Sequence, residues 1–303
     1  MSVLLFVTVR RRKPKSTRLD NVQPAALKQA LQVGNKEEPT RKEQAAPTQR
    51  NIGPDLGDVK FVSNNKKEMN MTGLFKDRPI FLVSSGPSLQ LMNLDRIREV
   101  QAMSFGINNS WSIFKPDIWT CADSPDRFLY SCWKDAQILK LVPSGLRNKN
   151  LRVKKDEDFY VSEEKPLDCP NVLYYSRNLD FNHRTFLDEN TVNWGCTGDK
   201  AGSLGHKGAR SVFLSALKLC YVLGFRTVYL CGVDFKMNEG VQNYAFPQER
   251  SLSSVKGNNV SYNVNSKRLE ELNKLFLRNN YRVFNCNPSS HLKAFPFLSF
   301  DEA

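Results

Sequence analysis

The sequence predicts an α/β protein: a single Rossmann-like, doubly wound and mostly parallel sheet with a small lid insertion. Three observations lead to this class. Short apolar runs of strand length alternate along the chain with segments of helical periodicity. These runs are apolar at nearly every position, as expected for strands that are covered on both faces. In the clearest unit, a helical pattern at 212–223 ends at Gly224 and leads into the strand-like run 227–231, which makes half of a βαβ unit.

The first predicted strand, 79–83, is followed by a polar glycine turn at 84–89 and a helical pattern that reaches Ile97. A strand, a glycine turn and a helix direct backbone N–H groups and the positive end of a helix at an anion, most often a phosphate. The turn matches neither GxGxxG nor the Walker A pattern, so an ordinary βα turn is the alternative interpretation.

Polar residues also follow the next two predicted strands. Strand 102–107 ends in Asn108 and Asn109, and strand 118–122 ends in Asp123. Because the carboxyl ends of parallel strands share one edge of a sheet, three polar strand ends in succession predict a common binding crevice. Asp123 is a candidate for hydrogen bonding to a ribose, for proton abstraction or for Mg²⁺ ligation. A turn-forming role before Pro125 is the alternative.

The predicted domain covers residues 78–303. Its further strands and one amphipathic helix are expected at 137–142, 171–175, 281–286 and, for the helix, 266–278. An insertion at about 143–200 includes a charged stretch and the segment 178–197, which we interpret as a long loop or a lid over the crevice. The polar segment 248–259 is predicted to be a flexible loop.

Residues 1–58 form a basic leader whose composition predicts disorder. Its first 50 residues contain eleven Lys and Arg and four Asp and Glu, so their net charge is 11 − 4 = +7. This is more than half of the formal net charge of +13. The remainder therefore has the charge balance of an ordinary soluble domain. A basic segment at 10–50 predicts non-specific contact with nucleic acid, and a solvated tail is the alternative.

The chain has seven cysteines, an odd number, and no CxxC pair. Several lie in apolar strand or helix contexts, which favours reduced core thiols, a cytoplasmic protein and no metal bound by cysteine. The apolar start at 3–9 is too short to span a bilayer, and charges follow it rather than precede it. Neither a membrane span nor a secretory signal is predicted.

Six blocks of sequence together resemble a known group of proteins. The blocks are Ser85-Gly86-Pro87-Ser88-Leu89, Asn108, the stretch 223–235, Asn243-Tyr244-Ala245-Phe246, Asn265-Ser266-Lys267 and Cys286-Asn287-Pro288-Ser289-Ser290. In this order they resemble the bacterial sialyltransferases of glycosyltransferase family 42. They are also similar to the related domain of unknown function 115, which includes motility accessory factors and an archaeal pterin pyrophosphokinase. The resemblance covers roughly residues 80–298 and leaves out the leader.

The resemblance implies a Rossmann-like fold that binds a cytidine nucleotide-sugar without a metal or other cofactor. The turn at 85–88 would cradle the nucleotide phosphate, with Asn108 and Asp123 at neighbouring strand ends. In the family, two tyrosines hold the leaving phosphate; Tyr244 matches the second, and Lys236 stands in the place of the first. A lysine ammonium neutralises a departing phosphate at least as well as a phenol does.

Two residues depart from the family pattern. Asn265 stands where the family has its general base, a histidine, and Ser85 replaces an asparagine. Because asparagine cannot accept a proton near neutral pH, acceptor activation must come from another group, and we expect His206 or Asp123. His206 precedes the helix predicted at 212–223, and the alternative is that it is a solvated loop histidine.

The remaining candidates would bind the nucleotide or its phosphate rather than react with it. They are Gly205, Lys207, Arg210, Gly232, Asp234, Tyr262 and Asn265. Tyr262 matches a family tyrosine near the phosphate. Lys207 and Arg210 would bind a phosphate or a sugar carboxylate, and surface charge at a helix end is their alternative. In this fold an aspartate at the position of Asp234 more often orders the following loop than performs chemistry.

The first functional hypothesis is a metal-independent glycosyltransferase that moves a sugar from a nucleotide-sugar, CMP-linked in the first instance, to an acceptor hydroxyl. The acceptor would be a glycan or a modified nucleobase in DNA. The second hypothesis is a Mg²⁺-dependent diphosphokinase like the pterin enzyme, with Asp123 as a metal ligand. The third is a nucleotide-binding module without catalysis. Nucleotide preference, Mg²⁺ dependence and release of the donor nucleotide separate the three.

Overall fold

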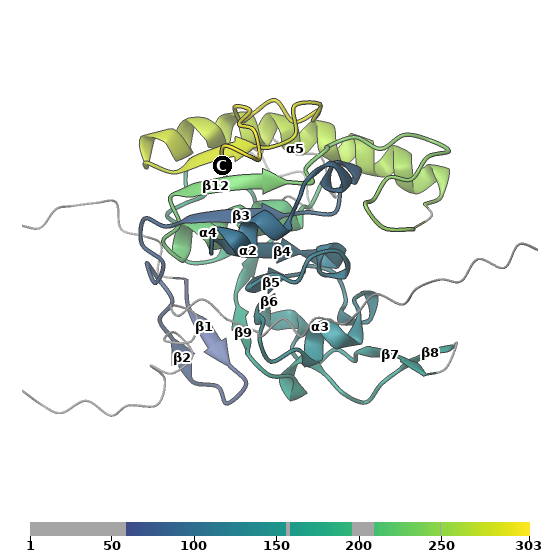
Figure 1. Cartoon of the computed structure of the whole chain (residues 1–303). Coiled ribbons are helices and arrows are strands. Elements are labelled where there is room, and N and C mark those ends of the chain that lie inside the picture. Colours follow the sequence, from purple (N-terminus) through teal and green to yellow (C-terminus); the bar gives the residue numbers. More distant parts are fainter. Residues whose placement is uncertain (1–58, 156–157, 196–208, 249) are drawn as a thin grey trace, which may run out of the picture.

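The structure, a computed structural model, describes residues 59–155, 158–195, 209–248 and 250–303 (Figure 1). Its main feature is a nine-stranded sheet in the order β13-β12-β3-β4-β5-β6-β9-β1-β2. The strands from β13 to β9 run parallel, and β1 and β2 add two antiparallel strands at one end. The predicted α/β class, with a Rossmann-like and mostly parallel sheet, is confirmed.

The elements are short apart from two helices. The strands of the main sheet are β1 (Phe61–Ser63), β2 (Glu68–Met69), β3 (Pro79–Val83), β4 (Met103–Ile107), β5 (Ile118–Thr120), β6 (Leu139–Pro143), β9 (Val172–Tyr175), β12 (Thr227–Cys231) and β13 (Arg282–Asn285). Two separate strand pairs are β7 (Arg152–Lys155) with β8 (Asp158–Val161) and β10 (Arg177–Asn178) with β11 (Val192–Asn193). The α-helices are α2 (Asp95–Glu99), α3 (Tyr130–Lys134), α4 (Val212–Val222) and α5 (Leu252–Arg278). Short 3₁₀ turns are η2 (Pro87–Leu91), η3 (Asn108–Ser112), η4 (Pro125–Arg127), η5 (Ser144–Leu146) and η6 (Pro166–Asp168).

Alternate residues of a strand enter cores on opposite faces of the sheet. In β3, Ile80 and Leu82 pack with α4 and α5, whereas Phe81 and Val83 pack on the other face with α2 and the C-terminal segment. Further along that second face, α3 covers the sheet through Trp133. Because helices cover both faces, the sheet is doubly wound, and its strands are apolar at nearly every position.

Helix α4 follows the sequence pattern closely. Every residue from Phe213 to Val222 is buried. Ser211 caps the helix, its Oγ accepting a hydrogen bond from Phe213 N at 3.2 Å, and Gly224 ends it at φ 101°. Lys218 on this helix can be buried because its Nζ donates hydrogen bonds to the carbonyl oxygens of Phe186 and Leu187, at 2.7 and 2.6 Å. The helix therefore joins the sheet to the segment around Phe186.

Helix α5 begins at Leu252, well before the helix predicted at 266–278. The segment 248–259, predicted to be a flexible loop, is therefore helical over most of its length. Ser251 caps the helix by accepting a hydrogen bond from Ser254 N at 3.3 Å. The first turns are polar, with Val255 as their buried apolar residue, so apolar periodicity gave no signal for them.

Residues 59–77 belong to the folded region, although the sequence placed its start near residue 78. They form β1 and β2, and Phe61 and Phe75 are buried in the main core. The Phe75 ring stacks on Phe225 with centroids 5.0 Å apart, and Gly73 N donates to Val222 O at 2.9 Å. Strands of two and three residues are too short to show alternation in a sequence.

The predicted insertion at about 143–200 is divided by β9, which lies inside the main sheet between β6 and β1. Before β9, the chain forms the β7–β8 hairpin. After it, Phe186 and Leu187 are buried with α4 in the main core. The described part of the predicted lid, 178–195, thus packs into the fold, and Trp194 near its end reaches the cavity described below.

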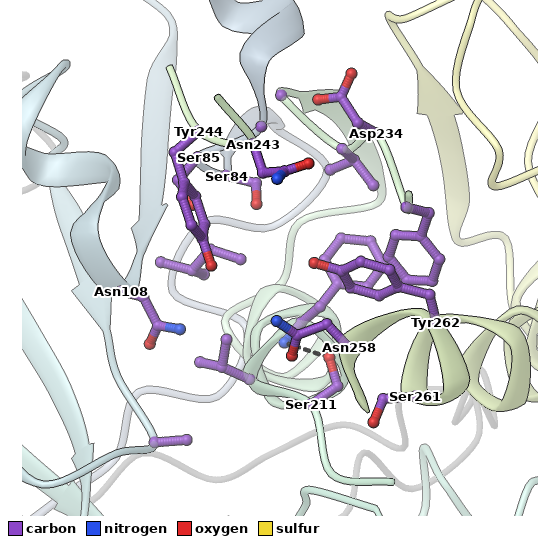
Figure 2. Close-up of a pocket in the computed structure, with 18 of the residues that line it drawn as sticks. Ser84, Ser85, Asn108, Ser211, Asp234, Asn243, Tyr244, Asn258, Ser261 and Tyr262 are labelled. Carbon is purple, nitrogen blue, oxygen red and sulfur yellow. Dashed lines mark hydrogen bonds between the residues drawn. The ribbon is translucent and has the colours of Figure 1, made fainter. Parts of the chain in front are cut away.

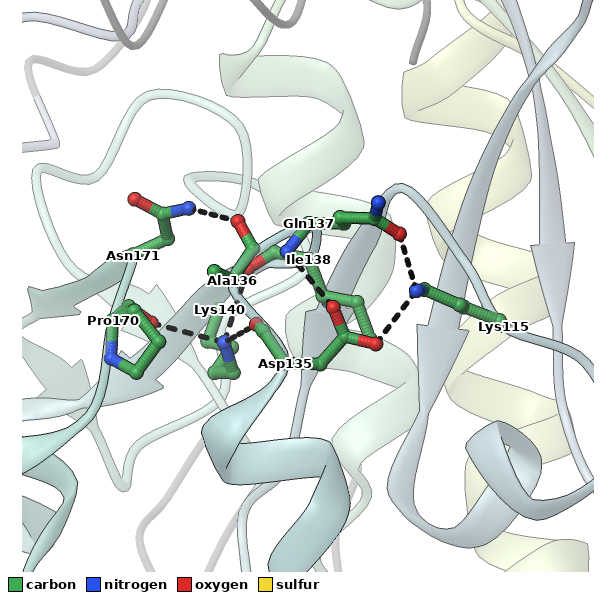
Figure 3. Close-up of polar contacts among 8 residues, drawn as sticks. All are labelled: Lys115, Asp135, Ala136, Gln137, Ile138, Lys140, Pro170 and Asn171. Atoms are coloured by element: carbon green, nitrogen blue, oxygen red, sulfur yellow. Dashed lines mark hydrogen bonds and ion pairs between the residues drawn. The ribbon is translucent and has the colours of Figure 1, made fainter. Parts of the chain in front are cut away.

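A buried lysine joins the start of β6 to the turns beside it (Figure 3). Lys140 Nζ donates to the carbonyl oxygens of Asp135, Ile138 and Pro170 at 2.6, 3.2 and 2.9 Å. Burial lowers the pKa of Lys140 to about 8. Lys115 Nζ lies 2.7 Å from Asp135 Oδ2, so two cations hold the same turn. This cluster lies at the amino end of the strand, away from the carboxyl ends discussed next.

The six cysteines in the described residues are free and buried: Cys121, Cys132, Cys169, Cys220, Cys231 and Cys286. Burial raises the pKa of five of these thiols, those of Cys121, Cys132, Cys169, Cys220 and Cys231, for example that of Cys169 to about 11. They therefore pack as small apolar groups. Cys196 lies outside the described residues.

Candidate functional site

A cavity of about 400 Å³ opens beyond the carboxyl ends of β3, β4, β5 and β12. Strand β3 lies between β4 and β12, so the chain leaves β3 in one direction and returns on its other side. Such a reversal is where open α/β sheets bind ligands. The lining residues are Ser84, Ser85, Gly86, Ile107, Asn108, Ala122, Asp123, Arg127, Trp194, Arg210, Ser211, Val212, Phe213, Gly232, Val233, Asp234, Phe235, Lys236, Asn243, Tyr244, Arg250, Asn258, Ser261 and Tyr262.

The glycine turn after β3 is packed directly against the loop after β12. Ser84 N donates to Cys231 O at 2.8 Å, and Gly86 N donates to Gly232 O at 2.9 Å. A Cβ at residue 86 would lie 2.5 Å from Gly232 O, so only glycine fits this approach. The two loops therefore form one wall of the cavity, with Ser84 and Ser85 facing it (Figure 2).

Asp234 holds that wall together. Its Oδ2 accepts hydrogen bonds from Ser88 Oγ at 2.9 Å and Ser88 N at 3.4 Å, and its Oδ1 accepts one from Asn287 Nδ2 at 2.9 Å. Burial raises the pKa of the Asp234 carboxyl, and these hydrogen bonds oppose the rise. With its oxygens engaged by residues of two other loops, Asp234 is placed to order the site rather than to react.

Asn108, at the end of β4, brings a polar side chain to the cavity (Figure 2). Its backbone is left-handed, at φ 50°, and its carbonyl oxygen accepts a hydrogen bond from Trp119 Nε1 at 2.7 Å. The side-chain Oδ1 is buried and has no hydrogen-bond partner among the described residues. A buried acceptor without a donor is costly, so Asn108 is available to a hydroxyl or amine of a ligand.

Asp123, after β5, also lines the cavity. Arg127 Nη1 lies 3.4 Å from its Oδ2, and both side chains are about half exposed or more, at 48% for Asp123 and 65% for Arg127. An ion pair this open to water is weak. The Asp123 carboxylate can therefore exchange Arg127 for a ligand group.

The loop after β12 carries Lys236 and Tyr244 into the lining. The Tyr244 ring stacks on Phe246 with centroids 5.4 Å apart. Arg250 Nε donates a hydrogen bond to Tyr244 Oη at 3.1 Å. Because the phenol oxygen accepts from Arg250, its own O–H is free to donate to a ligand oxygen. Asn243, which accepts from Asn238 N at 2.7 Å, fixes the loop beside Tyr244.

The early turns of α5 form the facing wall. Tyr262 stacks on Phe235 with ring centroids 5.0 Å apart, and Figure 2 shows the Tyr262 hydroxyl and the Asn258 side chain turned toward the cavity. Burial raises the pKa of Tyr262 well above its usual value, so its phenol remains a neutral hydrogen-bond donor. Phe235 has a left-handed backbone, at φ 55°, which turns its ring toward α5.

Most of the site residues expected from the sequence meet around this one cavity. Those that line it are Ser85, Gly86, Asn108, Asp123, Arg210, Gly232, Asp234, Lys236, Tyr244 and Tyr262. Ser88 lies behind the wall, bonded to Asp234, and neither it nor Pro87 lines the cavity. Gly205, His206 and Lys207 lie outside the described residues, so His206 stays a prediction.

Asn265, expected at the nucleotide site, is not in the lining. It is 2% exposed within α5, and its Oδ1 accepts a hydrogen bond from Arg268 Nη1 at 3.0 Å. Arg268 is itself fully buried and also donates to Ala209 O. Asn265 therefore supports the chain that leads into α4 instead of facing a ligand.

Several lining residues were not singled out from the sequence as site residues. They are Arg127, Trp194, Ser211, Phe235, Asn243, Arg250, Asn258 and Ser261. Arg250 lies only six positions after Tyr244, a predicted site residue, so this closeness in sequence could have identified Arg250 as a site residue. Asn258 and Ser261 carried none, because Asn258 lay in the predicted loop 248–259 and the predicted helix began only at residue 266, after Ser261.

The lining is predominantly basic. It contains the cations Arg127, Arg210, Lys236 and Arg250 and the carboxylates Asp123 and Asp234. Asp234 is already bonded to Ser88 and Asn287, which leaves the cavity with an excess of positive charge for an anionic ligand.

Within the described ranges, no group of three or more His, Cys, Asp or Glu side chains is arranged to hold a metal ion. In the same part of the chain, no helix combines the length and apolar character that crossing a membrane requires.

Comparisons with known proteins give one structural likeness. No protein-family model matches the chain, and no curated protein matches it. Among solved structures, the chain is similar to the MAf glycosyltransferase from Magnetospirillum magneticum AMB-1, at 14% sequence identity and a TM-score of 0.44. The match covers 82% of this chain and 37% of that chain, so this chain spans little more than a third of that protein's length.

Proposed function

We propose that the protein is a glycosyltransferase that takes a sugar from a nucleotide-sugar, CMP-linked in the first instance, and moves it to an acceptor hydroxyl. The observation that carries the proposal is the meeting of the glycine turn, Asn108, Asp123 and the Lys236–Tyr244 loop around one basic cavity. A nucleotide site needs N–H or O–H groups that donate hydrogen bonds to the phosphate, polar groups that bind the rest of the nucleotide, and positive charge. This cavity offers all three.

The leaving nucleotide would be stabilised at the loop after β12. Lys236 supplies a positive charge, and Tyr244 supplies an O–H whose oxygen already accepts from Arg250. Charge-assisted donors of this kind stabilise a phosphate most when its negative charge grows, as the bond to the sugar breaks. The Gly86 turn, which belongs to the same wall, would hold the same phosphate.

Asp123 would activate the acceptor. It is the lining carboxylate that is free of loop-ordering bonds, since its partner Arg127 is exposed and 3.4 Å away. A positioned carboxylate accelerates proton transfer from a hydroxyl by about 10²–10⁴-fold. His206 remains the second candidate for this role, from the sequence alone.

A decisive experiment is calorimetric titration of the full chain with CMP, UDP, GDP and ATP, each with Mg²⁺ and with EDTA. The proposal expects CMP to bind, with the same affinity in EDTA. Binding of ATP alone, and only with Mg²⁺, would overturn it in favour of the diphosphokinase hypothesis. The protein is then incubated with a CMP-sugar, and the release of CMP is measured. The proposal expects release, which a non-catalytic binding module would not produce.

A further inference from the structure

Two buried thiols lie side by side at the carboxyl ends of β12 and β13. The two strands pair in parallel, with Leu230 opposite Asn285, so the residues that come next, Cys231 and Cys286, are opposite each other as well. The backbone ladder reaches this level, because Cys286 N donates to Leu230 O at 3.0 Å. The two cysteines are therefore neighbours across the strand pair, although they are 55 positions apart in the sequence.

Both thiols point to the same face of the sheet. They belong to the core cluster on the face that α2 and the C-terminal segment cover. Two positions earlier, the rings of Tyr229 and Phe284 stack with centroids 6.0 Å apart. Neighbouring strands lie about 4.7–4.9 Å apart, within the Cα separation of about 4.4–6.8 Å that disulfides have. Burial raises the pKa of the Cys231 thiol, and its hydrogen bond with Cys286 raises it further, so the two groups already interact.

The pair lies at the root of the cavity wall. The carbonyl oxygen of Cys231 accepts the hydrogen bond of Ser84 N at 2.8 Å. Cys286 directly precedes Asn287, whose Nδ2 donates to Asp234 Oδ1 at 2.9 Å. A change in the spacing of these two strand ends therefore acts on the loops that form the wall.

We propose that Cys231 and Cys286 are a site of reversible oxidation, at which hydrogen peroxide closes a disulfide that weakens the cavity wall. Cys286 is 4% exposed and Cys231 is fully buried, so the peroxide reaches Cys286 first. The sulfur of Cys286 attacks the O–O bond, becomes a sulfenic acid and releases one water. The sulfur of Cys231 then displaces the hydroxyl of that acid as a second water. A dithiol restores both thiols by thiol–disulfide exchange.

The disulfide shortens the distance between the two strand ends. Its Cβ atoms stand about 3.5–4.5 Å apart, closer than the spacing of about 4.7–4.9 Å between neighbouring strands. The bond therefore draws Cys231 toward β13 and away from β3, because β12 lies between these two strands. The hydrogen bond from Ser84 N to Cys231 O lengthens, and Asn287 moves with Cys286. The resulting loss of nucleotide affinity rests on the proposed function.

The test treats the full-length protein with hydrogen peroxide and compares it with protein kept in dithiothreitol. Peptide mass spectrometry, after free thiols have been blocked, identifies the cysteines that are joined. Hydrogen exchange of the segments 84–88 and 286–291 measures the order of the wall without any ligand. Calorimetry with CMP measures the affinity of the cavity.

Four variants assign the response to this pair. Cys231→Ala and Cys286→Ala each remove one sulfur, and alanine keeps the small apolar character of a buried thiol. The matched control is Cys220→Ala, at a fully buried cysteine of α4. Cys196→Ala tests the cysteine that lies outside the described residues.

The expected product is a disulfide between Cys231 and Cys286 in the oxidised wild type. Exchange in the segment 84–88 should become faster, and the Kd for CMP should rise about tenfold, the effect of losing a hydrogen bond in the wall. Dithiothreitol should reverse all three changes. Reduced Cys286→Ala and Cys231→Ala should bind CMP as the wild type does and should not respond to peroxide, whereas both control variants should respond fully.

The inference is wrong if peroxide joins other cysteines or none, if exchange or CMP affinity is the same in both forms, or if Cys286→Ala still responds. Failure of the proposed function gives a different pattern. Peroxide would then join the pair and speed exchange, but neither form would bind CMP. Conversely, a reduced protein that binds CMP and in which peroxide joins no cysteines keeps the proposed function and loses the oxidation site.

Discussion

Asp234 lies where a side chain at Gly86 would have to stand. A Cβ at residue 86 would be 1.9 Å from Asp234 Oδ2, and the same oxygen accepts the hydrogen bond of Ser88 Oγ at 2.9 Å. The turn after β3 and the loop after β12 can therefore approach each other only because residue 86 has no side chain. Their contact forms the wall on which the proposed phosphate site depends.

Gly86→Ala should separate these two loops. We expect a loss of unfolding free energy of about 1–3 kcal/mol, because the new methyl group must displace Asp234 or the Gly232 carbonyl. Affinity for CMP should fall as well, since the wall shifts. Chemical denaturation and calorimetry measure the two effects. Gly145→Ala is the control because a Cβ there meets no atom within 4 Å; equal behaviour of the two variants would contradict the expectation.

Tyr244→Phe tests the proposed leaving-group site. It removes the hydroxyl that accepts from Arg250 Nε at 3.1 Å and keeps the ring that stacks on Phe246. We expect about a tenfold loss in CMP affinity and little change in stability. Arg250→Gln should weaken CMP in the same direction. The matched control is Tyr160→Phe, at an exposed tyrosine of β8, and a comparable loss there would argue against a specific role for Tyr244.

Asp123→Asn separates chemistry from nucleotide binding. The variant keeps the size of the side chain and removes its ability to accept a proton, so release of CMP from a CMP-sugar should slow by about a hundredfold or more. Affinity for CMP should stay within a few-fold of the wild type. Asp95→Asn, at an exposed residue of α2, controls for the lost charge. A rate unchanged by Asp123→Asn would transfer the role of base to another group, with His206 the next to test.

Lys140→Met removes the donor shared by three carbonyl oxygens, those of Asp135, Ile138 and Pro170. Leaving buried carbonyls without a donor costs about 1–3 kcal/mol for each group, so we expect a loss of at least about 3 kcal/mol in unfolding free energy. Lys267→Met, at an exposed position on α5, should change stability by less than about 0.5 kcal/mol. Similar losses in the two variants would refute a structural role for Lys140.

The wild type and Lys140→Met should also differ in how their stability depends on pH, and the sign of that difference follows from the pKa of Lys140. The folded pKa of Lys140 is about 8, lowered by burial from 10.5. Between pH 8 and 10.5 the unfolded chain therefore binds more protons at this residue than the folded one, and unfolding free energy gains a contribution that rises with pH. The difference in stability between wild type and Lys140→Met should widen across this window. A constant or shrinking difference would mean that the ammonium is retained in the fold.

Asn265→His should not create an active base, although the resemblance places the family histidine here. Position 265 is 2% exposed and bonded to Arg268 Nη1 at 3.0 Å, and it does not line the cavity. We expect a loss of thermal stability of several degrees, because an imidazole is larger than the amide it replaces. CMP release should not increase. A gain in rate with intact stability would show that residue 265 reaches the substrate.

The polar residues at strand ends could be predicted from the sequence to share a site, but the contacts between distant loops could not. Asn108 and Asp123 were predicted to meet because parallel strands end at one edge, and they do line one cavity. Gly86 and Asp234 come from turns 148 positions apart; no local pattern reports that Asp234 accepts from Ser88. Asn258 and Ser261 were missed because α5 begins with polar turns, and a polar helix lacks the apolar period by which helices are recognised.

By itself the sequence determined the class of fold and the edge of the sheet at which to look. Apolar runs of strand length need cover on both faces, and covered parallel strands must end together. Only the tertiary structure decided which groups share the cavity. It placed Asn265 behind the site, Arg250 against Tyr244, and Arg177 and Arg210 on Trp194. The reason is physical: burial and contact depend on distances between segments far apart in the chain, and local residue patterns do not fix those distances.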